Sequence, residues 1–347
     1  MNMTMKKIAE MAGVSRPAVS TVLGNSKCTR VSAKTRKKIL CLAEKYDFVP
    51  NLAARQLKGV SSNLIGLISV PSYLGLLSLA QTEVITVLQS RGLEVLTACM
   101  ISNRDQRKII NEFRTRRVNG IIGFALGSKI IQAKNDQIPM VYCSHNNRCG
   151  FDVGSDIGLG GYLAARHLLE HGRKKLVYLC LGATNSNFLK YGGVCKAFEE
   201  AGMKAEKDNF LVVENGNSKE IFSQLRKRRA DALICCNDYV AAEMLKVFLQ
   251  NGIKVPDDLA VTGFDGYFFC NFTPVSLATV IQPVGEMAQR AVELLIKRMD
   301  ARRSHEEFSS IRLPPSFQPG DSCGCPEPRK KMISGHPFIL LDDILIP

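Results

Sequence analysis

The segment KKIAEMAGVSRPAVSTVLGN, residues 6–25, constrains the fold more than any other part of this 347-residue chain. Its first apolar residues recur at helical spacing: Ile8, Ala9 and Ala12. Gly13 then interrupts the pattern where a sharp turn needs a positive φ, and Ser15 suits the N-cap of a second helix. The pattern therefore predicts two short helices joined by a tight turn.

The second of these helices has two unlike faces. At 100° per residue, one side is apolar and carries Ala18, Val19, Val22 and Leu23. The opposite side carries Arg16, Pro17, Ser20 and Thr21. A short polar face of this kind is able to enter a DNA major groove, as a helix-turn-helix requires. The alternative is a helical hairpin that serves only packing, since such hairpins are common.

The charge of the N-terminal region favours the first interpretation. Residues 1–60 hold twelve Lys or Arg and three acids, so they carry a net charge of +9 out of +14 for the whole chain. A third helix is expected after Ser32, with an apolar stripe of Ile39, Leu42, Ala43 and Tyr46. We therefore expect a basic, phosphate-binding head of three helices over residues 1–50. Residues 51–62 form a separate linker that contains the short helix-favouring segment 51–59.

Strands and helices alternate between residues 64 and 301. The expected strands are 64–70, 93–98, 118–125, 139–143, 176–181, 209–214, 231–236, 259–263 and 277–281. The expected helices are 77–91, 104–116, 158–171, 190–202, 218–229, 238–251 and 284–301. Most strands are unbroken apolar runs, which is typical of parallel strands covered on both faces. We therefore predict an α/β body of two lobes with parallel doubly wound sheets.

The body is expected over residues 63–325. Its first lobe takes about 63–170 and 284–311, its second lobe takes about 171–283 and 312–325, and a tail follows over 326–347. Hydrophobic residues make up 46% of the chain and charged residues 22%, as in ordinary globular proteins. The N-terminus lacks the apolar run of a signal peptide, and residues 64–80 are too short and interrupted for a membrane span. We therefore expect a cytoplasmic protein without a membrane segment.

The cysteines and histidines predict no metal site. The twelve cysteines are scattered, several of them in apolar runs, so free thiols in a reducing cytoplasm explain them better than disulfides. Cys323 and Cys325 are two thiols with no His cluster near them in the sequence, and we interpret them as an incidental tail motif. The few histidines form no triad-like pattern, and His167 fits an exposed helix surface.

The order and spacing of several motifs resemble the LacI/GalR (lactose-repressor) family of bacterial transcription regulators. In the head these are IAEMAGVSRPAVSTVLGN, VSAKTRKKIL and FVPNLAARQLK. In the body they are SDIGLGGYLAARHLLEHGRKKLVYL, LICCNDYVAAEML, VPDDLAVTGFDG and LATVIQP. The resemblance covers about residues 4–325. It implies a helix-turn-helix head followed by a two-lobed, periplasmic-binding-protein-like body.

The resemblance assigns base contacts to the second helix. Arg16 and Pro17 would touch base edges, and an Arg recognises guanine through two hydrogen bonds. A phosphate contact is the alternative for Arg16. Many members of the family have Arg where this chain has Thr21, so its operator need not match the usual one. The positions implied for DNA contact in the head are Thr4, Ser15, Arg16, Pro17, Ser20, Thr21, Asn25, Ser32 and Thr35.

The resemblance also makes residues 51–59 a hinge helix that folds on the operator and pairs with its dimer mate. Its DNA-contacting positions would be Asn51, Ala54 and Leu57, with Leu57 inserted into the minor groove as an apolar wedge. The alternative is a linker whose leucine packs against the body.

Ligand positions are implied between the lobes. The candidates are Tyr73, Asp156, Lys190, Asn237, Asp238, Asp265 and Gln282. Carboxylates at the carboxyl ends of strands suit paired sugar hydroxyls, because each accepts two hydrogen bonds. Structural alternatives exist for Asp238, as the first acid of a helix, and for Gln282, as a hydrogen bond between lobes. This chain departs from the family in having Lys190 where Arg is common and Ile157 where Asn is usual.

The implied function is sequence-specific regulation of transcription. A homodimer would bind a near-palindromic, double-stranded DNA operator, and a small polar, sugar-like effector would change its affinity. We expect repression relieved by the ligand, with no cofactor, metal, membrane partner or enzymatic activity. Two rivals are a periplasmic solute-binding protein and a sugar-processing enzyme; the basic head argues against the first, and the lack of a Walker loop, nucleophile elbow or HExxH argues against the second. A cleft that binds no ligand is a further alternative.

Overall fold

The computed structural model describes residues 3–24, 31–48, 62–71, 75–102, 105–124, 138–144, 151–214, 217–300 and 309–325. The chain divides into two compact units, Met1–Ser62 and Asn63–Pro347. Five predicted site residues lie outside the described residues, as does the predicted tail 326–347: Asn25, Asn51, Ala54, Leu57 and Tyr73. Among the described helices, none is long and apolar enough to cross a membrane.

The first unit contains the three expected helices, which are α1 (Met5–Ala12), α2 (Arg16–Leu23) and α3 (Ala33–Lys45). Gly13 ends α1 with a φ of 74°, which is the left-handed conformation that the sequence predicted for the turn. The helices share one small apolar core, made of Ile8, Ala9, Ala12, Val19, Val22, Ile39 and Ala43. Tyr46, which was expected in this stripe, follows the end of α3 and is exposed instead.

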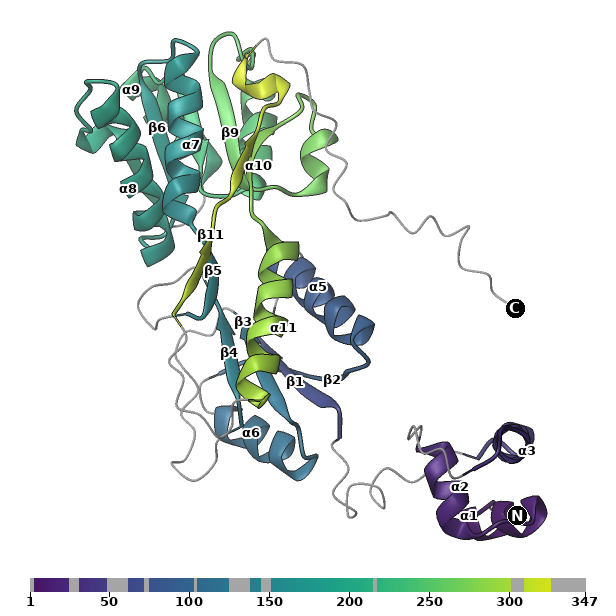
Figure 1. The fold of residues 1–347 in the computed structure, drawn as a ribbon. Helices are drawn as coiled ribbons and strands as arrows, with labels where there is room; N and C mark the ends of the chain where they lie inside the picture. The colour runs from purple at the N-terminus through teal and green to yellow at the C-terminus, as the bar shows by residue number, and fades with distance from the viewer. Residues whose placement is uncertain are drawn as a thin grey trace. The chain divides into compact units, whose positions relative to one another are not determined.

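The second unit contains two six-stranded sheets (Figure 1). The first has the order β11-β5-β4-β3-β1-β2, with all strands parallel, and the second has the order β12-β10-β9-β8-β6-β7, with only β12 antiparallel. The first sheet comprises β1 (Leu64–Ser69), β2 (Glu94–Cys99), β3 (Gly120–Phe124), β4 (Met140–Cys143), β5 (Val153–Ser155) and β11 (Ile311–Leu313). The second comprises β6 (Leu176–Leu181), β7 (Phe210–Val213), β8 (Ala232–Cys235), β9 (Ala260–Asp265), β10 (Ala278–Ile281) and β12 (Ser316–Gln318).

Helices cover the sheets, as the unbroken apolar strands predicted. In the first lobe these helices are α5 (Leu76–Ser90), α6 (Gln106–Thr115) and α11 (Val284–Asp300). In the second lobe they are α7 (Ile157–Glu170), α8 (Asn185–Glu200), α9 (Ser218–Arg228) and α10 (Asp238–Gln250). The first lobe has two separate apolar clusters. One contains residues of α5 and α11, the other contains residues of α6, and each includes strand residues of its own. The prediction of parallel doubly wound α/β lobes is thus confirmed.

The lobe boundary predicted at residue 170 is wrong, because α7 belongs to the second lobe. Ala164 and Leu168 of α7 are buried in the core of the second sheet, and α7 packs along α8. The second lobe therefore begins at Ile157. An alternating pattern of strands and helices does not reveal this boundary, because a helix that follows a first-lobe strand is free to pack on either sheet.

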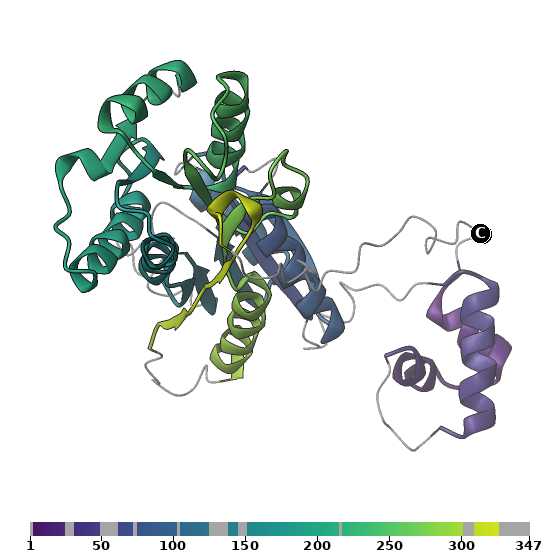
Figure 2. The ribbon, with the colours of Figure 1, turned by 90° about the horizontal axis from the view of Figure 1, so that it is seen from above.

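The C-terminal segment joins the two lobes. Its strand β11 pairs with β5 in the first sheet, and β12 pairs with β10 in the second, so the chain passes between lobes at residues 314–315 (Figures 1 and 2). Strands β5, β11 and β12 were not predicted, since each has only three residues. The prediction that His167 lies on an exposed helix surface is wrong, because its ring is half-buried and its centroid lies 4.4 Å from that of the Phe317 ring.

Candidate functional sites

The start of α2 is the exposed part of the head. Ser15, Arg16 and Pro17 are exposed, whereas Val19 and Val22 of the same helix are buried. Ser15 is the N-cap residue, but its side chain makes no capping hydrogen bond. Because the N–H groups of a first helical turn carry partial positive charge, this uncapped end favours contact with an anion such as phosphate. Ser20 and Thr21 follow one turn later and are half-buried.

Three further predicted contact residues of the head have structural hydrogen bonds. Thr4 caps α1 by accepting a hydrogen bond from the Lys7 N–H at 3.3 Å. Ser32 caps α3 by accepting from the Thr35 N–H at 3.2 Å, and the hydroxyls of Ser32 and Thr35 lie 2.8 Å apart. These bonds position the first turns of α1 and α3. The DNA contacts of all three residues stay predictions.

In the second unit, three predicted ligand positions meet where strands β8, β9 and β10 end. Gln282 follows β10, and its Nε2 donates a hydrogen bond to Asp265 Oδ1 at 2.7 Å. Lys190 reaches the same region from α8, and its Nζ donates to the carbonyl oxygen of Cys236 at 2.7 Å. The ammonium also lies 3.8 Å from the centroid of the Phe264 ring. A cation from α8, a carboxylate and an amide thus meet at the carboxyl ends of parallel strands, and their contact with a ligand stays a prediction.

Two features of this group are typical of a binding site. Asp265 has a φ of 110°, a conformation that L-residues rarely adopt and that is found at functional positions. Gln282 is 5% exposed, and its Oε1 has no hydrogen-bond partner among the described residues. Burial raises the pKa of Asp265, and the nearby Lys190 ammonium counteracts that rise. The group therefore offers an unsatisfied acceptor near an ammonium and a carboxyl group.

Asp238, in contrast, is fully buried and has structural partners. Its Oδ2 accepts hydrogen bonds from the N–H groups of Gly266 and Tyr267, both at 2.8 Å. Its Oδ1 accepts from the Thr279 hydroxyl at 2.5 Å. Burial, with Asp265 nearby, raises the pKa of Asp238 to about 7. These contacts tie the start of α10 to β10 and to the loop after β9, and a direct ligand role for Asp238 stays a prediction.

Asn237 and Asp156 are both helix caps. Asn237 Oδ1 accepts from the Val240 N–H at 2.9 Å, and Asp156 Oδ1 accepts from the Leu159 N–H at 3.0 Å. Next to Asp156, Ser155 ends β5 and was not predicted as a site residue. Ser155 is 3% exposed, and its hydroxyl has no hydrogen-bond partner among the described residues. A buried, unsatisfied hydroxyl cannot be recognised from a serine in the sequence, because burial here depends on the sheet.

Tyr267 was also missed, and it joins the two lobes. Its hydroxyl oxygen accepts a hydrogen bond at 2.5 Å from the N–H of Leu76, the first residue of α5 in the first lobe. The centroid of the Tyr267 ring lies 5.0 Å from that of Tyr239 and 5.5 Å from that of Phe269. The run of aromatic residues after Asp265 was the sequence feature that could have indicated this contact. Because the bond spans the lobes, a movement of one lobe against the other would break it.

Two family models match the chain. The model described as "Bacterial regulatory proteins, lacI family" matches residues 4–51. The model described as "Periplasmic binding protein-like domain" matches residues 165–323. The first match covers the three helices of the head, and the second covers most of the second lobe.

Curated relatives match over most of the chain. The HTH-type transcriptional regulator DegA of Bacillus subtilis is 31% identical over 344 residues, which cover 91% of this chain and 97% of the relative. The HTH-type transcriptional repressor PurR of Haemophilus influenzae is 28% identical over 330 residues, which cover 90% of this chain and 96% of the relative.

Solved structures share the fold. A lac repressor dimer bound to operator and the anti-inducer ONPF matches with a TM-score of 0.80 at 20% identity, over 93% of this chain and 99% of that one. A complex of the transcriptional regulator CelR with cellobiose matches with a TM-score of 0.66 at 20% identity, over 92% of this chain and 100% of that one.

Proposed function

Since the chain belongs to the LacI family of bacterial regulatory proteins, we propose that it represses transcription by binding a near-palindromic operator as a homodimer. The family consists of DNA-binding transcription regulators with an effector-binding domain, so the enzyme and the periplasmic solute-binding protein are no longer alternatives. The finer proposal concerns which residues contact the operator, what kind of effector binds, and how the effector changes DNA affinity.

The observation that carries the DNA-binding proposal is the exposed start of α2 within a strongly basic unit. Arg16 and Pro17 are exposed, and the Ser15 side chain makes no capping bond, so these side chains are available to a major groove. The lac repressor dimer of similar fold is bound to operator, which supports the dimeric arrangement. Leu57 as a minor-groove wedge lies outside the described residues and is proposed from its sequence position alone.

The proposed effector is a small polar molecule with several hydroxyls. Lys190 supplies donors, Asp265 supplies acceptors, and the buried Gln282 Oε1 is unsatisfied among the described residues. Groups of both kinds suit hydroxyls, which donate and accept. The CelR relative of similar fold holds cellobiose, and this supports a sugar-like ligand. Ligand binding beside the Tyr267–Leu76 bond would favour one lobe arrangement, and DNA affinity would follow by linkage.

The operator is tested by selecting bound fragments from random DNA with the full chain, followed by titration of the selected sequence at several salt concentrations. We expect a near-palindromic consensus and a steep fall of affinity with salt. A shuffled sequence of equal length is the control. Equal affinity for the selected and shuffled sequences, or an affinity independent of salt, would contradict the proposal.

The effector is tested by repeating the titration with a panel of sugars and related polar metabolites. For the compound that changes operator affinity, Lys190→Met should raise the concentration needed for that change at least about tenfold, which corresponds to about 1.4 kcal/mol. Methionine keeps the apolar stem over Phe264 but removes the charge. Lys196→Met is the matched control, because Lys196 lies on the same helix with 66% of its side chain exposed. Equal responses of the two variants would argue against Lys190 as a ligand residue.

A further inference from the structure

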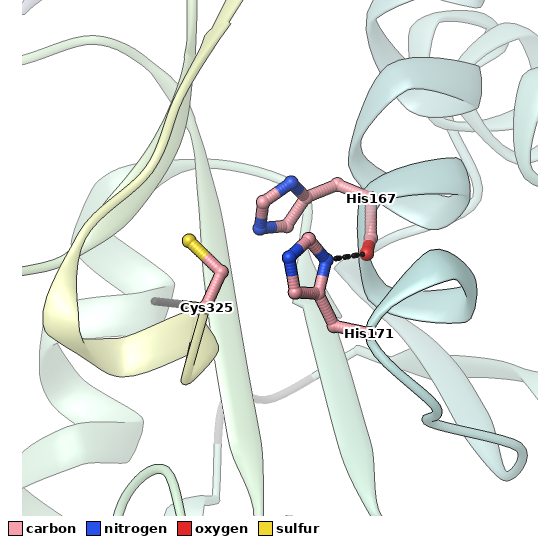
Figure 3. A group of neighbouring side chains, drawn as sticks. All are labelled: His167, His171 and Cys325. Atoms are coloured by element: carbon pink, nitrogen blue, oxygen red, sulfur yellow. Dashed lines mark hydrogen bonds between the residues drawn. The ribbon is translucent and has the colours of Figure 1, made fainter. Parts of the chain in front are cut away.

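We propose that His167, His171, Cys323 and Cys325 form a zinc-binding site that fastens the C-terminal segment to α7. The four residues are brought together by the fold, because the two histidines precede the two cysteines by about 150 positions. Figure 3 shows His167 and His171 extending from α7 toward the Cys325 sulfur on the opposite segment. The site lies within the second lobe and has no part in the proposed DNA or effector contacts.

His167 lies in the last turn of α7 and His171 is the C-cap residue, and at this spacing of four the two side chains extend from the same face of the helix end. Their ring centroids are 4.3 Å apart. One ligand atom each from His167, His171 and Cys325 lies within 4.8 Å of the other two. Two imidazoles at this helical spacing, opposed by a thiol, are a common arrangement for binding zinc.

Cys323 is the proposed fourth ligand; it is not among the three residues whose ligand atoms all lie within 4.8 Å of one another, so its sulfur must shift when the ion binds. Its sulfur lies 3.2 Å from His167 Nε2 and 3.5 Å from the Cys325 sulfur. In a tetrahedral site with Zn–N of about 2.0 Å and Zn–S of about 2.3 Å, neighbouring ligand atoms are about 3.3–3.8 Å apart. Both separations are therefore close to those that a zinc ion imposes.

Local backbone structure supports this arrangement. The 3-10 helix η4 (Asp321–Cys323) ends at Gly324, which has a φ of 76°. This left-handed turn lets the chain reverse between the two cysteines, so that both sulfurs lie on the same side. A Cβ at Gly324 would also come within 3.0 Å of the Pro256 side chain. Glycine between the cysteines is thus required by the turn itself.

The hydrogen bond of His171 orients its ring for metal binding. His171 Nδ1 lies 2.7 Å from the carbonyl oxygen of His167. A carbonyl only accepts, so Nδ1 carries the proton and Nε2 keeps its lone pair for a metal. Histidine ligands in zinc sites commonly make this bond to a backbone carbonyl.

The ligand set selects the class of ion. Two imidazoles and two thiolates suit zinc, whereas magnesium and calcium require oxygen ligands. Binding would deprotonate both thiols, and the Cys323 thiol would give up its present hydrogen bond to the Gly320 carbonyl. Four protein ligands leave no open position, so the role would be structural. The ion would connect the end of α7 to the segment that follows β12 after the chain has crossed into the second lobe.

The test uses the full chain, purified with reduced thiols and stripped of metal by a chelator. We expect it to bind one zinc per chain in a competition titration and to unfold at a higher temperature when loaded. Cobalt substitution should give the thiolate-to-cobalt absorption of a tetrahedral site. His171→Ala and Cys325→Ser should each lower zinc affinity at least about 100-fold, because even loss of an outer-shell partner costs about 10–100-fold.

Cys99→Ser is the matched control, because Cys99 is an exposed free cysteine of the first lobe. It should keep the zinc affinity of the parent chain. The cobalt spectrum of the parent chain provides a test that does not depend on whether the variants fold. Absence of thiolate absorption, equal zinc affinity of the parent and Cys325→Ser chains, or a Cys323–Cys325 disulfide persisting under reductant would each overturn the proposal.

Discussion

The head and the second lobe hold their proposed functional side chains in opposite ways. In the head, Arg16 and Pro17 are exposed, and the residues buried beneath them are apolar. In the second lobe, Lys190, Asp238 and Gln282 are buried at 7%, 0% and 5% exposure, and each is held by hydrogen bonds to its neighbours. At the start of α2 the proposed binding residues are therefore separate from those that hold the fold, whereas in the lobe the same polar groups contribute to both. Substitutions in the two regions should differ accordingly.

The largest expected effect is on the stability of the second lobe. Asp238→Ala leaves two backbone N–H groups and the Thr279 hydroxyl without their acceptor in a buried place. At about 1–3 kcal/mol for each buried group left unsatisfied, the free energy of unfolding should fall by about 3–5 kcal/mol. Urea unfolding of the full chain measures this, with Asp258→Ala, an exposed loop acid, as the comparison. A loss below about 1 kcal/mol would show that the lobe does not depend on Asp238.

The next effect is a pH dependence of the same lobe. Burial and the nearby Asp265 raise the pKa of Asp238 from 3.8 to about 7, so the folded chain retains a proton that the unfolded chain releases. The free energy of unfolding should therefore fall as pH rises from about 4 to about 7, and should level off above that. One proton contributes at most about 1.4 kcal/mol per pH unit, so a loss of about 3–4 kcal/mol is expected across this range.

Unfolding experiments across this pH range check the sign. Asp238→Asn should make the free energy of unfolding depend less on pH. A smaller dependence should remain, because burial also raises the pKa of Asp265. A stability that rises with pH over the same interval would contradict the assignment to Asp238.

In the head, Arg16→Ala should weaken operator binding without changing stability. Loss of a bidentate guanine contact costs about 1–3 kcal/mol, and Arg16 is exposed and its side chain makes no hydrogen bond or ion pair to another described residue. Titration against the selected operator and against operators altered at single positions distinguishes the two interpretations of Arg16. If Arg16 reads a base, the variant loses discrimination at one position; if it contacts phosphate, affinity falls equally for all sequences.

The same contrast explains what the sequence could predict. The head and most strands were predicted because caps, turns and apolar periodicity are local, as Gly13 and the run from β8 into Asn237 illustrate. Pairings between distant residues were not predictable. The His167–Cys323 contact and the Tyr267–Leu76 bond join positions 156 and 191 residues apart, and only the folded sheets bring them together. For the same reason the lobe boundary was misplaced and the short strands at the lobe crossing were missed.

The smallest expected effect distinguishes capping from DNA contact within the head itself. Thr4 and Ser15 both precede helices, but only Thr4 makes a side-chain capping bond, to the Lys7 N–H at 3.3 Å. Thr4→Ala should therefore lower the melting temperature of the head by an amount that corresponds to about 1 kcal/mol, whereas Ser15→Ala should leave it nearly unchanged. In operator titrations the order should reverse if the Ser15 hydroxyl binds phosphate. Equal losses of stability for the two variants would mean that Ser15 caps α2 in solution, and the uncapped start of α2 would then not explain anion binding by the head.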